Sequence, residues 1–316
     1  MKQDKKDIQR NIAASFFKDT LVRFRTISSN NLEALQNDRL YYSTPNNFND
    51  PYDTLIYANY LQILQDVSHN LEIGMDSYLE QLKDKDIPNA KNIAGIGYAM
   101  WNGSNKDEFL DGFFQKICEA VKTVKETLRR NVRIICFSEE YLSMLMWSHY
   151  ADNHKGFAIV YDKNDIEKAK NYTESGEPIR KKSILRQVTY AEEQTDLTLE
   201  IEDYVRVHDM PHLGDVTAPI PNLSQDKLRR MMTEKSPDWS YEKEWRVIPR
   251  HISLKQESNL GYMGVKPKAV ILGSKCSNDN RCQIIDICNG KRIPVFQADL
   301  NYLEPGYKLL LRTPDI

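Results

Sequence analysis

One ten-residue segment, Trp239-Ser-Tyr-Glu-Lys-Glu-Trp-Arg-Val-Ile248, constrains the fold of this chain more than any other. In an extended strand, successive side chains point to opposite faces. This alternation places Glu242, Glu244 and Arg246 on one face and the aromatic ring of Trp245 on the other. The apolar face suits a core, so the charged face borders either solvent or the wall of a charged cleft.

Composition narrows the classes of protein and partner that the chain can represent. Its 316 residues, 41% of them hydrophobic, suffice for one large or two modest domains. A net charge of −2 creates no overall field that favours nucleic acid or membranes. The five cysteines form no CxxC pair, which favours reduced thiols in a cytoplasmic protein over disulfides or structural zinc. We expect neither a signal peptide nor a membrane-spanning run of about 18 apolar residues, and hence no membrane partner.

Predicted strands and helices follow one another irregularly, which favours an α+β fold over a regular doubly wound sheet. Period-two alternation and short apolar runs predict strands at 20–26, 40–43, 132–138, 156–162, 183–190, 241–248, 269–272, 293–297 and 306–311. Helical spacing predicts helices at 7–17, 56–84, 105–129, 165–172, 195–206, 223–234 and 278–287, with a loop at 208–222. We therefore predict a single domain over 1–316, with a mostly β core and a helical insertion over about 56–130.

Four stretches of the sequence carry a resemblance to a known family. They are LVRFRT (21–26), LYYSTPNNFNDPYD (40–53), CFSEEYLSMLMWSHYADNHKGFAIVYD (136–162) and YEKEWRVI (241–248). With their motifs FNDP, WSHYAD-x-H-x-GF and EKEWR, they resemble the bacterial family named domain of unknown function 2971, in order and in spacing. The resemblance runs over most of the chain, and the family name itself implies no activity.

A more distant resemblance is to the ADP-ribosyltransferase fold, and more narrowly to the DNA-targeting ADP-ribosyltransferase toxins of bacterial defence systems. It is carried by a basic first strand, a capped Asn-Leu helix, an aromatic-Ser strand and a late strand with Glu, here Lys243-Glu-Trp-Arg-Val247. Glu242-Lys-Glu244 also matches the E-x-E motif of arginine-directed members. The first strand departs from the pattern, because it contains Arg23 and Arg25 and no His-Gly-Thr. The resemblance implies an ADP-ribosyltransferase-like mixed β core and NAD as the substrate.

The chemistry of that activity explains the residues predicted to be catalytic, which are Glu244, Glu242 and Arg25. Cleavage of the nicotinamide–ribose bond builds positive charge on the ribose, as in glycoside hydrolysis. A fixed carboxylate such as Glu244 stabilises that charge and holds the 2′-hydroxyl. Glu242 can orient or deprotonate the acceptor. The alternative for Arg25 is a purely structural ion pair with Glu244 or with Asp50.

NAD binding is predicted to use Arg23, Arg25, Tyr41, Tyr42, Ser43 and Asp50. The arginine side chains suit the pyrophosphate, because a guanidinium fork matches phosphate oxygens. One of Tyr41 and Tyr42 can stack on a flat ring, and Ser43 shares the face of Tyr41. Neighbouring strand residues face opposite ways, so only one of the two tyrosines lines the cleft; core and edge packing is the alternative for them. Asp50 lies in a turn that follows the strand directly.

The segment His149-Tyr-Ala-Asp-Asn-His154 and the late strand supply the predicted acceptor-binding residues, which are His149, Tyr150, His154 and Arg246. His149, Asp152 and His154 are also conceivable metal ligands. Their spacing fits no zinc pattern and no fourth ligand is evident, so no metal is predicted. Lys181, Lys182, Arg186, Arg229 and Arg230 form either a basic patch for nucleic acid or a solvated surface.

We therefore predict a cytoplasmic glycosyltransferase that transfers ADP-ribose from NAD to a macromolecule, with RNA or DNA as the expected acceptor. The resemblance implies a toxin or antiviral-defence setting, with an antitoxin or defence-system protein as partner. Two alternatives stay open: a non-catalytic nucleotide or nucleic-acid sensor domain, and a metal-independent nuclease. The enzyme hypothesis predicts that the strands at 20–26 and 241–248 lie close together, with Arg25 and Glu244 facing one pocket.

Overall fold

The computed structural model describes residues 15–84, 89–103, 106–180, 183–208, 221–254, 256–302 and 305–314. Most of the helix predicted at 7–17, most of the loop predicted at 208–222, and Lys181 and Lys182 of the predicted basic patch lie outside these ranges. The fold is mixed α+β, as the irregular succession of strands and helices predicts. Among the described residues, no helix is both long and apolar enough to cross a membrane.

The centre of the fold is an eight-stranded sheet in the order β16-β15-β14-β5-β1-β4-β12-β8. Its strands are β1 (Thr20–Arg25), β4 (Ile135–Ser138), β5 (Phe157–Asp162), β8 (Ser183–Gln187), β12 (Glu244–Pro249), β14 (Ala269–Leu272), β15 (Val295–Leu300) and β16 (Leu309–Arg312). Only β14 and β15 are parallel, so the sheet is mixed. A second sheet joins β2 (Arg39–Tyr41), β13 (Tyr262–Gly264), β6 (Lys170–Tyr172) and β7 (Pro178–Ile179).

Both faces of the large sheet are covered by apolar side chains. Leu21 of β1 belongs to a core that also includes side chains of α2 (Ser29–Gln36), α8 (Lys163–Lys168) and α11 (Asn278–Lys291). Val22 and Phe24 belong to a separate core that includes Trp147 of α7 (Met144–Tyr150). Successive residues of β1 thus enter different cores, so this strand is buried on both sides, and any charged residue on it must lie close to a cavity or a partner.

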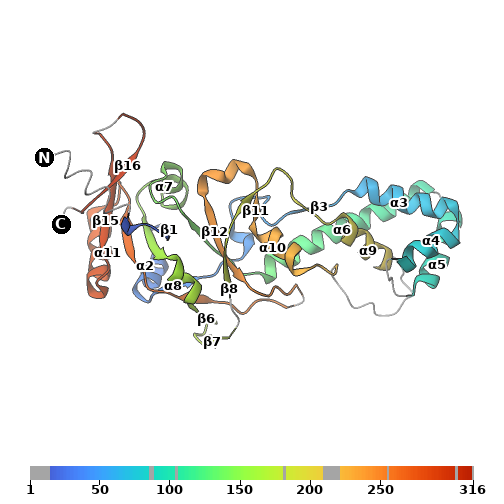
Figure 1. Ribbon diagram of the computed structural model, residues 1–316, viewed down its shortest axis with the longest axis horizontal. Coiled ribbons are helices and arrows are strands. Elements are labelled where there is room, and N and C mark those ends of the chain that lie inside the picture. The colour runs from blue at the N-terminus through green and yellow to red at the C-terminus, as the bar shows by residue number, and fades with distance from the viewer. Residues whose placement is uncertain are drawn as a thin grey trace.

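A third core holds a set of helices, most of which extend away from one end of the sheet (Figure 1). They are α3 (Tyr60–Ile73), α4 (Met75–Asp84), α5 (Ala90–Gly103), α6 (Lys106–Asn131), α9 (Thr198–His208) and α10 (Gln225–Thr233). The helix predicted at 56–84 is instead a short strand, β3 (Ile56–Tyr57), followed by α3 and α4, which are separated by Gly74 with a φ of 139°. The predictions of a single domain and of an inserted helical segment stay predictions.

The large sheet opens between two of its central strands. β1 pairs with β5 along all six residues, but with β4 only at Val22–Ser138. Ile134, just before β4, pairs instead with Ser43 through two backbone hydrogen bonds of 2.9 Å. The segment after β2 therefore occupies part of the edge of β4 that β1 leaves free, and a space remains between the two strands.

The strand predicted at 241–248 begins three residues later than expected. Residues Pro237–Glu242 form a 3-10 turn, η2, and Lys243 has a left-handed backbone with a φ of 42°. Only then does β12 begin, at Glu244. Glu242 therefore does not share the strand face of Glu244 and Arg246, because the turn rather than the strand period sets its direction. Two short ladders complete the fold, β3 with β10 (Thr195–Asp196) and β9 (Thr189–Tyr190) with β11 (Glu234–Lys235).

Candidate functional site

A cavity of about 240 Å³ lies at the opening between β1 and β4. A cavity above one face of a strand touches alternate residues, yet this one is lined by four consecutive residues of β1, 22–25, and by three of β4, 136–138. It therefore meets the strands at their edges. The loop over 47–49 closes one side, and Lys235, Glu242 and Glu244 form another.

Arg25 and Glu244 both line this cavity, but they do not project from one face of the sheet. Val22 pairs with Ser138, and Ser138 pairs with Glu244, so these three residues share a face. Arg25 lies on the opposite face by alternation along β1. The two side chains therefore line one cavity, as the enzyme hypothesis predicts, but β4 lies between β1 and β12 and the two residues leave the sheet on opposite faces.

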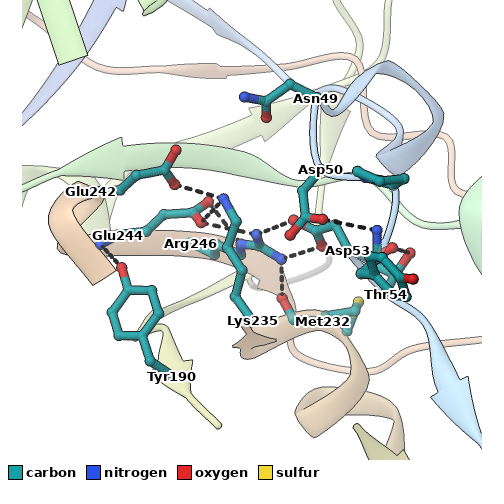
Figure 2. Close-up of polar contacts among 12 residues, drawn as sticks. Asn49, Asp50, Asp53, Thr54, Tyr190, Met232, Lys235, Glu242, Glu244 and Arg246 are labelled. Atoms are coloured by element: carbon teal, nitrogen blue, oxygen red, sulfur yellow. Dashed lines mark hydrogen bonds and ion pairs between the residues drawn. The ribbon is translucent and has the colours of Figure 1, made fainter. Parts of the chain in front are cut away.

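The acidic wall of the cavity is a buried ion cluster of Asp53, Lys235, Glu242, Glu244 and Arg246 (Figure 2). Arg246 holds Asp53 at 2.5 and 2.9 Å, and it holds Glu244 at 2.8 and 2.9 Å. Lys235 Nζ is 2.6 Å from Glu242 Oε2 and 3.4 Å from Glu244 Oε2. Of the two alternatives for the charged residues of the 239–248 segment, the structure therefore supports the cleft wall over the solvated surface, and these residues are also packed against countercharges.

The two glutamates of the cluster have opposite pKa shifts. Burial raises the pKa of Glu242, and Lys235 only partly opposes this. Burial alone would also raise the pKa of Glu244, but Arg246 and Lys235 lower it from 4.5 to about 2. Since Lys235 Nζ contacts both carboxylates, their nearest oxygens are at most 6.0 Å apart (2.6 plus 3.4 Å). Such a split is typical of an acid and a base that act on one substrate.

Tyr150 connects Glu242 to the loop that closes the cavity. Its hydroxyl donates to Glu242 Oε1 at 2.5 Å and accepts from Asn49 Nδ2 at 2.8 Å. Burial, followed by the charge of Glu242, raises the pKa of Tyr150, so the phenol stays protonated and keeps donating. This places Tyr150, a predicted acceptor-binding residue, directly beside the carboxylate with the raised pKa.

The cationic wall of the cavity is formed by Arg23 and Arg25. Arg23 is 9% exposed; one terminal nitrogen donates to the Tyr41 carbonyl at 3.1 Å and the other, Nη1, has no hydrogen-bond partner. Burial, together with Arg25, lowers the pKa of Arg23 to about 9. Burial also lowers the pKa of Arg25. No carboxylate of the described residues forms an ion pair with either guanidinium, so an anion in the cavity would meet two uncompensated charges.

Several residues predicted to bind NAD do not line the cavity. Tyr41 is 40% exposed, and Tyr42 is buried, with hydrogen bonds of 2.8 Å to Asn171 and Ser183. These are the edge and core roles that the sequence left open for the two tyrosines. Asp50 is buried in its turn, where it accepts from the Tyr52 backbone at 2.8 Å (Figure 2). Of the four residues Tyr41, Tyr42, Ser43 and Asp50, only Ser43 lines the cavity.

The two predicted histidines also lie outside the cavity lining. His154 is buried, with its Nε2 atom 3.2 Å from the Ser148 hydroxyl, and burial lowers its pKa. His149 is exposed and lies near the ring of Tyr241. Arg246 does line the cavity, but its contacts with Asp53 and Glu244 leave it a positioning role rather than acceptor binding. Among the described residues, no group of three or more His, Cys, Asp or Glu side chains is arranged to hold a metal ion.

Three residues of the site were not predicted from the sequence: Asn49, Asp53 and Lys235. Asn49 lies in the FNDP segment and Asp53 follows it by two residues, so the density of polar residues there was an available signal. Lys235 had no such signal, because it is one lysine among many. Its position on β11 becomes apparent only through the parallel pairing of Lys235 with Tyr190, whose hydroxyl accepts from the Glu244 backbone at 2.8 Å.

Comparison with known proteins gives one finding. A family model described as protein of unknown function (DUF2971) matches residues 146–247. The match supports the resemblance to this family over that part of the chain. This DUF2971 segment runs from α7 to β12 and contains Tyr150, Lys235, Glu242, Glu244 and Arg246, whereas β1 and the FNDP loop precede it. No curated protein and no solved structure matches the chain.

The lowered pKa of Glu244 predicts a loss of stability in acid. Because the folded state favours the ionised form, its contribution is present above about pH 4.5 and is lost as pH falls through about 2. A shift of this size corresponds to about 3 kcal/mol. Glu242 acts with the opposite sign, since its raised pKa favours protonation in the folded state.

Urea unfolding of the wild type and Glu244→Gln between pH 7 and 2.5 measures this contribution. The wild type should lose more free energy of unfolding than the variant as pH falls. Equal losses in the two proteins would show that Glu244 is not held ionised by Arg246 and Lys235.

Proposed function

We propose that this protein cleaves the nicotinamide–ribose bond of NAD and transfers ADP-ribose to a macromolecular acceptor. The observation that carries the proposal is the pair Glu242 and Glu244, with opposite pKa shifts and oxygens within 6.0 Å, in a cavity whose other wall is cationic. A pair of neighbouring carboxyl groups, one with a raised and one with a lowered pKa, is the usual apparatus for substitution at a glycosidic carbon. An ADP-ribosyltransferase-like core, a defence role and a cytoplasmic location belong to this proposal and rest on the resemblance of the sequence.

The contacts of the two glutamates suit the roles that the sequence suggested for them. Both Glu244 oxygens accept from Arg246, and one also faces Lys235, so this carboxylate is fixed and stays ionised. It is suited to stabilise positive charge that develops on the ribose. Glu242 has the raised pKa and the phenol of Tyr150 beside it. It is therefore the better candidate for the group that takes the acceptor proton.

The size of the cavity suggests how NAD lies in it. A volume of about 240 Å³ is below the range of about 300–1,000 Å³ for pockets that enclose a drug-sized ligand. The cavity therefore receives the nicotinamide–ribose end of NAD, and the adenosine end lies outside. Arg25, at the end of β1, is the cation best placed for a phosphate at that boundary.

Arg25→Ala should weaken NAD binding by about 1.5–3 kcal/mol, because a charged hydrogen bond to phosphate is lost. Isothermal titration calorimetry measures this, with the exposed Arg130→Ala of α6 as a matched control that keeps wild-type affinity. No detectable binding of NAD by the wild type, with or without nucleic acid, would refute the proposal. Equal weakening by both variants would remove Arg25 from the site.

A second candidate function is a non-catalytic nucleotide sensor. It is favoured by the saturation of Glu244, whose oxygens already accept hydrogen bonds from Arg246 and Lys235. A sensor would bind NAD in the same cavity and release no nicotinamide with any acceptor. A nicotinamide-release assay on the same samples distinguishes the two functions.

A further inference from the structure

A second hollow, of about 520 Å³, lies at the other end of β12 from Glu244. Its lining includes Arg180, the chain from 249 to 253, and Asn131 at the end of α6. Asn131 fixes that chain, since its Nδ2 donates to the Leu254 carbonyl at 2.7 Å and its own carbonyl accepts from the Ser258 backbone. We call this hollow the β12 groove.

The β12 groove combines an apolar floor with a cationic rim. Val132, Ile252 and Leu260 are buried beneath it. Arg180 and Arg250 are exposed at the rim, and neither guanidinium has a hydrogen bond or ion pair to a described residue. The exposed His251 also lies there.

The acidic side chain in the lining does not cancel the charge of these arginines. Glu257 is already paired with Arg133 at 2.6 Å. The rim therefore keeps an uncompensated positive charge from two guanidinium groups, above a floor that is suited to the apolar face of a base or sugar. Lone surface arginines are common, but two unpaired ones facing a hollow with an apolar floor favour an anionic ligand that also has flat apolar parts.

We propose that the β12 groove binds single-stranded nucleic acid, with Arg180 and Arg250 on its phosphates. Guanidinium forks match phosphate oxygens, and an apolar floor accepts bases without reading their sequence. β12 spans six residues, so the groove lies about 17 Å from Glu244 at about 3.3 Å per residue. A nucleic-acid strand bound in the groove is therefore anchored within a few nucleotides of the cavity. That this strand is the acceptor rests on the proposed function, whereas its binding to the groove does not.

The test is fluorescence anisotropy with labelled 20-nucleotide single-stranded DNA and RNA, without NAD, at several salt concentrations. We expect Arg180→Ala/Arg250→Ala to bind at least tenfold more weakly than the wild type at low salt. The slope of log affinity against log salt should also fall by about 1.4, since each lost phosphate contact on a single strand contributes about 0.7. The control Lys91→Ala/Lys122→Ala removes the same charge from exposed positions on α5 and α6, and should keep wild-type binding.

Wild-type affinity and salt slope in Arg180→Ala/Arg250→Ala would overturn the proposal, as would equal weakening by the control pair, which would mean that only net charge matters. Competition with inorganic pyrophosphate shows whether the groove prefers a single-stranded nucleic acid or a small anion. Binding of pyrophosphate without binding of either oligonucleotide would also overturn it. Because NAD is absent from every sample, a failure here says nothing of nicotinamide release, and the two proposals fail separately.

Discussion

Glu242→Gln should lower the rate of ADP-ribose transfer, and of the nicotinamide release that accompanies it, by about 10²-fold or more while the protein stays folded. A positioned acid–base group contributes about 10²–10⁴-fold to a rate. Glutamine keeps the size of the side chain and can still accept from Tyr150, but it cannot take a proton at neutral pH. The rate of nicotinamide release at saturating NAD and acceptor is the quantity to compare with the wild type.

A matched control and a binding measurement make this result specific to Glu242. Glu140→Gln makes the same chemical change in an exposed ion pair with Lys243, and it should keep the wild-type rate. Calorimetry with NAD shows whether Glu242→Gln still folds and binds. A variant that binds NAD and keeps the wild-type rate would remove Glu242 from the reaction and leave Glu244 as the only candidate carboxylate.

Arg246→Met should cost about 3–5 kcal/mol of unfolding free energy, the largest effect on stability that we expect from a single substitution. Arg246 is fully buried and holds both Asp53 and Glu244. Without Arg246, two buried carboxylates lose their shared countercharge. The loss of unfolding free energy therefore reflects two uncompensated buried charges and exceeds that of one lost contact. Urea denaturation at pH 7 measures the loss.

Arg230→Met is the matched control for this prediction. Arg230 forms an ion pair with Glu234 at 2.7 Å, but its side chain is 63% exposed, and exposed pairs contribute at most about 1 kcal/mol. A difference of about 2 kcal/mol or more between the two variants is therefore expected. If both lost the same small amount, the buried cluster would not be held together by Arg246.

The sequence was most informative where the alternation of side chains along a strand alone determined which residues share a face. Alternation in the segment 239–248 correctly indicated a strand with Glu244 and Arg246 on one face. It was wrong for Glu242, because the left-handed Lys243 resets the direction of the chain before the strand begins. The residue types gave no warning, since a lysine rarely adopts a positive φ.

The split sheet and its consequences could not be predicted from local patterns. The separation of β1 from β4 depends on Ser43 pairing with Ile134, two residues 91 positions apart in the sequence. The same holds for Lys235, which reaches the glutamates through the pairing of two-residue strands. The α+β class follows from the order of helices and strands, but which strands become neighbours is set by long-range packing.

The central claim is tested most directly with NAD that carries a radioactive adenylate phosphate. The wild-type protein would be incubated with it and with separate pools of single-stranded DNA, RNA and protein, and free nicotinamide and labelled acceptor would be measured together. We predict nicotinamide release with matching label on one acceptor pool for the wild type, and a rate of both that is lower by about 10²-fold or more for Glu242→Gln. Intact NAD and unlabelled acceptors in every pool, from wild-type protein shown by calorimetry to bind NAD, would contradict the transferase and leave the sensor.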